Sequence, residues 1–401
     1  MCIRDREDSE IGMCGMLKKS MYGTRDAAQN WECAYAEFML SIGFKRGIAT
    51  PCAFLHEGRD VRVVVHGDDF TVLGYGKDLD WFRGMIQGTF EVKFRGRIGP
   101  ADEDQKSIRV LNRVIEWTQE GIQLEPDQRH AEIIIRDLGL VQSKPVSTPG
   151  VPMHDRQVEA DDDEKLGPRE ATQHRAMVAR ANYLAQDRTD IQYTVKELSR
   201  KFAEPCKADH KALKRLGRYL IGRERVRTLY RWQSAVKEVT CYVDTDYAGC
   251  VRTRKSTSAG VLMIGTHVVK AWSVTQAVVA LSSGEAEYYG LVRGGSVALG
   301  LRSVLSDLGM DMSVCIKSDA SAAIGIASRR GLGKVRHIEV NQLWLQEKVA
   351  NKVITVVKIK GTENPADALT KYLNSEKLLW HMKVVSSAVC QDRHALMPSL
   401  G

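Results

Sequence analysis

Four acidic residues in separate segments of the chain have the side-chain type that a divalent metal site requires. Each lies at the edge of a segment with a clear pattern, and together they are Asp244, Glu287, Asp319 and Asp367. Their spacings of 43, 32 and 48 residues are too long for one local motif. Carboxylate oxygens are preferred ligands of Mg²⁺, and two such ions can stabilise the attacking and leaving oxygens of a phosphodiester. The residues therefore indicate a nuclease, although four ordinary surface acids would give the same spacing.

Short β-rich runs and a helix surround the first two acids. The runs cover residues 239–243, 260–264 and 268–272. Asp244 directly follows the first of them. The helix that carries Glu287 begins with a capping-box pattern, in which Ser282 is followed three residues later by Glu285. Gly309 is expected to end this helix.

Two further strands precede the other two acids. A strand over 313–318 leads to Asp319, and a strand over 353–359 comes before the corner that carries Asp367. The whole order is three strands, a helix, a strand, helices, a strand and a terminal helix. That order is the one of the ribonuclease H fold, so we expect a mixed five-stranded sheet that brings the acids together.

Several motifs in this part closely resemble the ribonuclease H domain of copia-type LTR retrotransposon Pol polyproteins. They are VDTDYAG, KSTSAGVL, LSSGEAEYYGL, HIEV and NPADALTKYL, and the match covers about residues 238–373. The resemblance implies that the four acids are catalytic and bind Mg²⁺ or Mn²⁺. It also implies that water cleaves the RNA strand of an RNA–DNA hybrid, which the 2′-hydroxyl distinguishes from DNA.

Some nearby residues compete for the same roles. Asp246 lies two residues after Asp244 and shares its strand face, but the position in the motif favours Asp244. Glu287 matches the family's helix glutamate, whereas Glu285 is interpreted as a charge at the helix N-terminus. His337 could shuttle protons, but a packed or solvent-facing histidine is favoured, and it is left outside the predicted site.

An Asp-Asp pair marks the N-terminal part of the chain. Asp68 and Asp69 lie in VRVVVHGDDFTVLG, which predicts two strands joined by a tight turn. Adjacent carboxylates repel unless a cation compensates them, although a simple acidic turn is the alternative. The segments LKKSMYGTRDAAQNWE and GFKRGIATPCAFLHE resemble the copia-type reverse transcriptase palm. The resemblance implies that both aspartates bind metal and that template-primer nucleic acid is a partner.

The palm segment departs from the family pattern. The family has Tyr-Val-Asp-Asp where this chain has His-Gly-Asp-Asp, and Asp26 stands where the family has a neutral amide. No part of Met1–Leu17 matches the strand that carries the family's third aspartate, although Asp5 and Asp8 occur there. We therefore expect an N-terminally truncated polymerase half that does not synthesise DNA.

The charge of the chain is basic and uneven. Its net charge is +8, and the segment between Lys196 and Arg231 has twelve Lys or Arg against four acids. Helical spacing places four of these cations on one face, namely Lys207, Lys211, Lys214 and Arg218. A solvated face is the alternative. Because the helix lies between the two enzymatic parts, contact with nucleic-acid phosphates is favoured.

The predicted fold is multidomain, with α/β and α+β parts. We expect a partial reverse transcriptase palm at 1–141, a linker at 142–170, a helical basic connection at 171–237, a ribonuclease H-like domain at 238–373 and a tail at 374–401. The linker holds four prolines and an acidic cluster. Nine cysteines without a Cys-x-x-Cys pair indicate reduced intracellular thiols, and no apolar run is long enough for a membrane. The resemblance implies cytoplasmic particles and the nucleus as locations, and other parts of the Pol polyprotein as partners.

Two other functions stay open. The chain could be a nucleic-acid-binding remnant in which the four acids are present but unused. It could also be another nuclease of the ribonuclease H fold, such as an integrase or a junction resolvase. The integrase interpretation is weakened because no zinc-binding His/His/Cys/Cys cluster precedes the acids.

Overall fold

The computed structural model of the protein describes residues 20–21, 23–152, 162–333 and 335–400. Contacts divide these residues into two compact units. The first contains the described residues up to Lys93 together with Ser303–Met310, and the second contains Phe94–Arg302 and Asp311 onward. None of the helices in these ranges is long and apolar enough to cross a membrane.

The first unit is an antiparallel sheet packed against two helices. Its strands, in sheet order, are β1 (Lys45–Arg46), β2 (Ala53–His56), β3 (Val61–His66) and β4 (Asp69–Leu73). The helices are α1 (Ala27–Ser41) and α2 (Gly76–Thr89), and a short 3-10 turn η2 (Glu57–Arg59) joins β2 to β3. Every second residue of β3 is buried, beginning with Val61, so its apolar face forms the core with α1 and α2.

The second unit contains the mixed five-stranded sheet that the sequence predicts. The strands are β9 (Glu238–Asp246), β10 (Thr257–Ile264), β11 (His267–Thr275), β12 (Ser313–Ser318) and β13 (Thr355–Lys358). Their spatial order is β11-β10-β9-β12-β13, with β9 to β11 antiparallel and β9, β12 and β13 parallel. This topology has the element order of the ribonuclease H fold, so the predicted fold class is confirmed.

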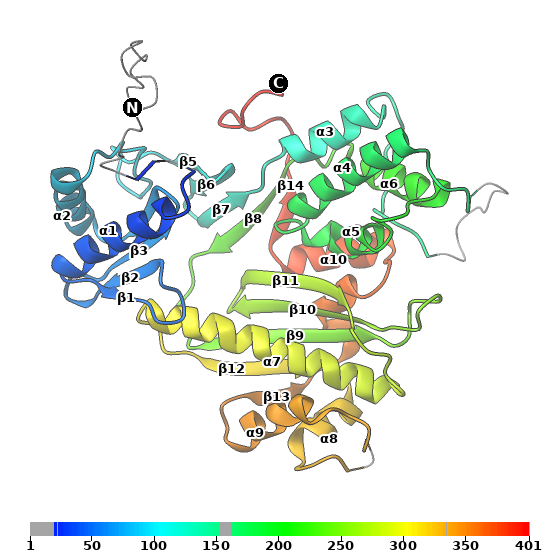
Figure 1. The fold of residues 1–401 in the computed structure, drawn as a ribbon. Helices are drawn as coiled ribbons and strands as arrows, with labels where there is room; N and C mark the ends of the chain where they lie inside the picture. The colour runs from blue at the N-terminus through cyan, green and yellow to red at the C-terminus, as the bar shows by residue number, and fades with distance from the viewer. Residues whose placement is uncertain (1–19, 22, 153–161, 334, 401) are drawn as a thin grey trace, which may run out of the picture. The chain divides into compact units, whose positions relative to one another are not determined.

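The helix α7 (Ser283–Asp307) lies across this sheet (Figure 1). Two glycines let it approach β9 closely. A Cβ atom at Gly290 would lie 2.5 Å from Thr245 Oγ1, and one at Gly294 would lie 2.5 Å from Val243 Cγ1. The close approach matters for function because Glu287 stands one turn before Gly290 on the same helix.

Other short elements complete the ribonuclease H-like part. They are α8 (Ser321–Ser328), η5 (Val340–Leu343), α9 (Trp344–Ala350), η6 (Gly361–Glu363), η7 (Pro365–Leu369) and α10 (Ser375–Val384). Ala366 and Leu369 of η7 pack with Ala259 and Val261 of β10 in one buried cluster. The corner that carries Asp367 is therefore fixed to the sheet by apolar packing.

A second sheet in this unit joins segments that are far apart in the chain. Its strands, in sheet order, are β14 (Ser387–Val389), β8 (Val226–Arg231), β7 (Gly121–Glu125), β6 (Arg113–Trp117) and β5 (Ser107–Val110). The segment 374–401, expected as a tail, contributes both α10 and β14. A strand of three residues is too short for a periodic pattern, and its pairing with β8 depends on distant residues.

One helix from the end of the predicted palm and the helices of the predicted connection share one apolar core. They are α3 (Arg129–Asp137), α4 (Pro168–Leu184), η4 (Thr189–Ile191), α5 (Gln192–Ser199) and α6 (Lys207–Leu220). Directly before η4, Arg188 is fully buried and forms an ion pair of 2.8 Å with Asp190, which also accepts a hydrogen bond from Tyr219. The buried charges are paired, as burial of ions requires.

Candidate functional site

Three of the four predicted acids come together beside the mixed sheet. One carboxylate oxygen from each of Asp244, Glu287 and Asp319 lies within 4.8 Å of the other two. Asp244 belongs to β9, Glu287 to the first turns of α7, and Asp319 directly follows β12. We call this group the acidic cluster.

Asp244 is buried and held by a hydroxyl group. Its side chain accepts a hydrogen bond from Thr370 Oγ1 at 2.6 Å, and only 7% of the residue is exposed. Burial raises the pKa of Asp244 to about 6, and the nearby Asp367 and Asp319 carboxylates add to the increase. The Thr370 hydrogen bond opposes it by favouring the charged form.

Glu287 has an oxygen that lacks a partner. The Thr245 backbone amide hydrogen-bonds to the carboxylate, but the buried Oε2 atom has no hydrogen-bond partner among the described residues. Burial raises the pKa of Glu287 to about 9, and the Asp244 and Asp319 carboxylates contribute to this shift. An orphaned buried oxygen is costly unless a proton or a cation binds it.

Asp319 is approached closely by a backbone segment. A Cβ atom at Gly361 would lie 2.6 Å from Asp319 Oδ2, so a larger residue there would require this carboxylate to shift. The acidic cluster is thus bounded by the same loop that leads to Asp367.

Asp367 lies outside the acidic cluster. Its Oδ1 atom forms an ion pair of 2.5 Å with Lys371 Nζ, four residues later. Asn364 anchors the corner, because its Nδ2 atom donates to the Val243 carbonyl at 2.8 Å and its Oδ1 accepts from the Ala366 amide. Asp367 is near enough to Asp244 to raise the pKa of that residue.

The competing glutamate has a different role. Glu285 is 1% exposed and accepts hydrogen bonds from the Leu281 amide and the Tyr289 hydroxyl. His337 Nε2 lies 2.7 Å from its Oε2 atom. Because these groups occupy both oxygens of Glu285, they order the start of α7 and leave Glu287 for the cluster. The contact with His337 joins segments 52 residues apart, and no sequence motif predicts it.

The hairpin of the first unit has the expected form. His66 pairs with Asp69 across a turn of Gly67 and Asp68, and Gly67 has a φ of 63°. Trp31 Nε1 donates to the Gly67 carbonyl at 2.8 Å, which holds the tip of the turn. Both aspartates are exposed, and in the described ranges no third ligand residue groups with them. Asp5 and Asp8 lie outside the described residues.

The basic face of α6 is partly paired with acids of the loop before α4. Lys207 forms an ion pair of 2.8 Å with Glu164, and Lys211 one of 2.7 Å with Asp162. Arg218 Nε donates to the Lys144 carbonyl, while Lys214 is exposed. Exposed ion pairs contribute only about 0–1 kcal/mol each, so a nucleic acid could replace these partners.

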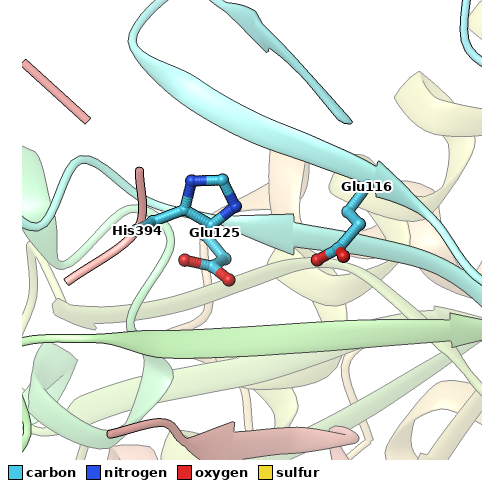
Figure 2. Close-up of side chains that lie close together, drawn as sticks. All are labelled: Glu116, Glu125 and His394. Atoms are coloured by element: carbon cyan, nitrogen blue, oxygen red, sulfur yellow. The ribbon is translucent and has the colours of Figure 1, made fainter. Parts of the chain in front are cut away.

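A second group of possible metal ligands lies on the other sheet of the second unit (Figure 2). It consists of Glu116, Glu125 and His394, whose ligand atoms lie within 4.8 Å of one another. However, both oxygens of Glu125 already accept hydrogen bonds from Arg225, at 2.6 and 2.8 Å. The guanidinium group supplies the positive charge that a metal ion would bring, so we interpret this group as an ion-pair network.

The acidic cluster has the properties of a divalent metal site. Its donors are hard carboxylate oxygens, which suit Mg²⁺ and Mn²⁺. Glu287 Oε2 is buried without a hydrogen-bond partner among the described residues, and burial together with the neighbouring carboxylates raises the pKa values of Asp244 and Glu287. The residues present therefore fit the predicted metal.

Comparison of the sequence with known proteins finds similar Pol polyproteins of transposons. No family model matches the chain. It is 26% identical over 370 residues to the retrovirus-related Pol polyprotein from transposon TNT 1-94 of Nicotiana tabacum, covering 90% of this chain and 27% of that protein. It is also 26% identical over 363 residues to the Pol polyprotein from transposon RE1 of Arabidopsis thaliana, covering 89% and 24%. The chain spans about a quarter of the length of these relatives.

A solved structure is also similar. The foamy viral protease-reverse transcriptase in complex with RNA/DNA hybrid matches 85% of this chain and 39% of that chain, at 10% identity and a TM-score of 0.45.

The mixed sheet and its crossing helix have a ribonuclease H-like arrangement. The sequence relationship covers nine-tenths of the chain. The relatives that the chain resembles are retrovirus-related Pol polyproteins of transposons, so the predicted similarity to a retrotransposon Pol region is confirmed.

Proposed function

We propose that the second unit hydrolyses the RNA strand of RNA–DNA hybrids with Mg²⁺ or Mn²⁺ as cofactor. The observation that carries this proposal is the acidic cluster on a ribonuclease H-like sheet, with the unpartnered Glu287 Oε2 among its atoms. The direct test is cleavage of labelled RNA–DNA and DNA–DNA duplexes with Mg²⁺ and with EDTA. Equal cutting of both duplexes would instead favour another nuclease of this fold.

The residues of the cluster have distinct roles in the proposed reaction. Asp244, Glu287 and Asp319 would hold the metal, and Thr370 would orient Asp244 through its hydrogen bond. When bound, the metal supplies Lewis-acid stabilisation of the charge that develops on the phosphate. With a pKa of about 9, Glu287 holds a proton at neutral pH in the metal-free protein, and it must release that proton when a cation binds.

The partners and the location follow from the same proposal. The proposed nucleic acids are an RNA–DNA hybrid at the acidic cluster and a template-primer at the hairpin with Asp68 and Asp69. Other parts of the Pol polyprotein are further proposed partners. An intracellular location is supported by the free thiols of the described cysteines.

Thr370 provides a specific test of the metal site. Thr370→Val removes the hydroxyl group with little change of volume and leaves a buried oxygen of Asp244 unpaired. Groups that orient metal ligands typically affect affinity about 10–100-fold. We expect the Mg²⁺ concentration for half-maximal cleavage to rise by about tenfold in this variant, while Thr370→Ser stays near the wild type. Identical Mg²⁺ requirements of the two variants would contradict the orienting role.

The cations of α6 are expected to differ in their contribution to binding. The double variant Lys214→Gln with Arg218→Gln should make the negative slope of log affinity against log salt shallower by about two units for an RNA–DNA hybrid. Lys207→Gln with Lys211→Gln should change it less, because these side chains already pair with Glu164 and Asp162. Fluorescence anisotropy across a salt series measures both slopes. An unaltered slope in the first double variant would show that α6 is a solvated face.

A further inference from the structure

A lysine occupies the edge of the acidic cluster. Lys371 Nζ lies 2.5 Å from Asp367 Oδ1, and the adjacent residue Thr370 holds Asp244. The lysine is half exposed, with 52% of its side chain accessible, whereas Asp367 is 26% accessible. A single cation thus contacts the one predicted ligand that stays outside the acidic cluster.

The charge of Lys371 acts on the whole site. Burial opposes its charged form, but the hydrogen bond with Asp367 and the nearby Asp244 and Asp246 carboxylates raise the pKa of Lys371 above the ordinary lysine value. In return, Lys371 is among the groups that lower the pKa values of Asp244 and Glu287. The ion pair with Asp367 therefore places a positive charge beside the acidic cluster.

We propose that Lys371 is an internal counter-ion of the acidic cluster, which a divalent ion must displace from Asp367 before all four acids can act as ligands. The inference rests on the proposed metal-dependent function and goes beyond it. It assigns Lys371 the role of setting the divalent ion concentration at which the site fills completely.

The physical reason is competition for the same oxygen. Asp367 Oδ1 can bind the ammonium group or a metal ion, and a metal ion beside the lysine would also be repelled by its charge. The three acids of the cluster can bind a first ion without moving Lys371. Recruitment of Asp367 for a second ion requires breaking the ion pair, so the second ion should bind more weakly than the first.

Removal of the lysine charge should therefore strengthen binding of the second ion. In Lys371→Met, Asp367 loses its competitor and the site gains one net negative charge. We expect the dissociation constant of the second Mn²⁺ to fall by roughly tenfold, a change typical of one close charge at a partly solvated site. The affinity of the first Mn²⁺ should change less, because its ligands do not contact Lys371 directly.

The experiment is a Mn²⁺ titration of the full chain, with free Mn²⁺ measured by electron paramagnetic resonance in the absence of nucleic acid. It compares the wild type with Lys371→Met, with Lys371→Arg, which keeps the charge, and with Lys377→Met as the matched control. Lys377 lies in the first turn of α10 and is exposed, so its replacement removes the same charge away from the cluster. Circular dichroism establishes that each variant is folded.

A tighter second site in Lys371→Met, with Lys371→Arg and Lys377→Met near the wild type, is the expected result. The difference in binding of the second Mn²⁺ should vanish when Asp367→Asn is added both to the wild type and to Lys371→Met. In that background the carboxylate for which the lysine and the metal compete is absent. Unchanged binding in Lys371→Met would overturn the inference but leave the proposed function intact. Weaker binding would also overturn it, since Lys371 would then orient Asp367 or contact phosphate. Absence of Mn²⁺ binding in the wild type would overturn both proposals.

Discussion

Asp319→Asn is expected to lower Mg²⁺-dependent cleavage of the RNA strand in an RNA–DNA hybrid by roughly 10²–10³-fold or more, the loss typical of removing one preorganised electrostatic group. The change replaces one charged oxygen of the acidic cluster by an amide of nearly equal volume. Because Asp319 is one of only three carboxylates in the cluster, the remaining charge would hold a divalent ion poorly. Cleavage rates at saturating hybrid and several Mg²⁺ concentrations measure the loss.

The same variant should not be less stable than the wild type. In the wild type the Asp319 carboxylate helps to raise the pKa values of Asp244 and Glu287, so it disfavours the charged forms of both neighbours in the metal-free protein. Asp311→Asn is a matched control, since this exposed acid precedes β12 and therefore lies at the opposite end of that strand from Asp319. A rate for Asp319→Asn equal to that of the control would remove Asp319 from the proposed site, and with it the metal role of the cluster.

The strands around the acids could be predicted because their signals are local. The run ending at Ser318 matches β12 residue for residue, and the capping residues Ser282 and Glu285 mark the start of α7. Gly309 has a φ of 79° and lies just after the end of α7, as the sequence predicts. Each of these features depends on neighbours within a few residues, which is the range over which sequence patterns are informative.

The finer geometry of the site depends on contacts between distant residues. The sequence predicts Asp367 beside the other acids; in the structure it pairs with Lys371 and is not among the three acids of the cluster. The acids of the loop before α4, expected as part of a linker, pair with Lys207 and Lys211 of the basic helix. The sequence shows which residues are charged, but it does not show which acid pairs with which lysine. A long side chain can reach several oppositely charged neighbours, and the resulting ion pairs have similar energies.

The glycines of α7 have different packing environments, which helix propensity alone does not predict. Glycine costs about 1 kcal/mol relative to alanine inside a helix, so its repeated use suggests a compensating need. Gly294 faces the stiff side chain of Val243, with only 2.5 Å for a Cβ atom, whereas Gly300 has no atom within 4 Å of such a position. The two glycines therefore have the same local propensity and opposite environments.

Gly294→Ala and Gly300→Ala should accordingly have effects of opposite sign on stability. Gly300→Ala should stabilise the protein by about 0.5–1 kcal/mol through helix propensity. Gly294→Ala should destabilise it by about 1–3 kcal/mol, because the added methyl group must displace Val243 or push α7 away from β9. Thermal denaturation of both variants and the wild type, at one scan rate, measures the difference.

A movement of α7 caused by Gly294→Ala should also affect the proposed active site. Glu287 and Gly294 lie on the same helix, about two turns apart, and β9 carries Asp244 next to Val243. A shift of α7 away from β9 would separate Glu287 from Asp244, so Gly294→Ala should also raise the Mg²⁺ concentration needed for cleavage. Gly300→Ala should leave that concentration unchanged. Equal stabilities and equal Mg²⁺ requirements in the two variants would mean that the close contact between α7 and β9 does not position the cluster.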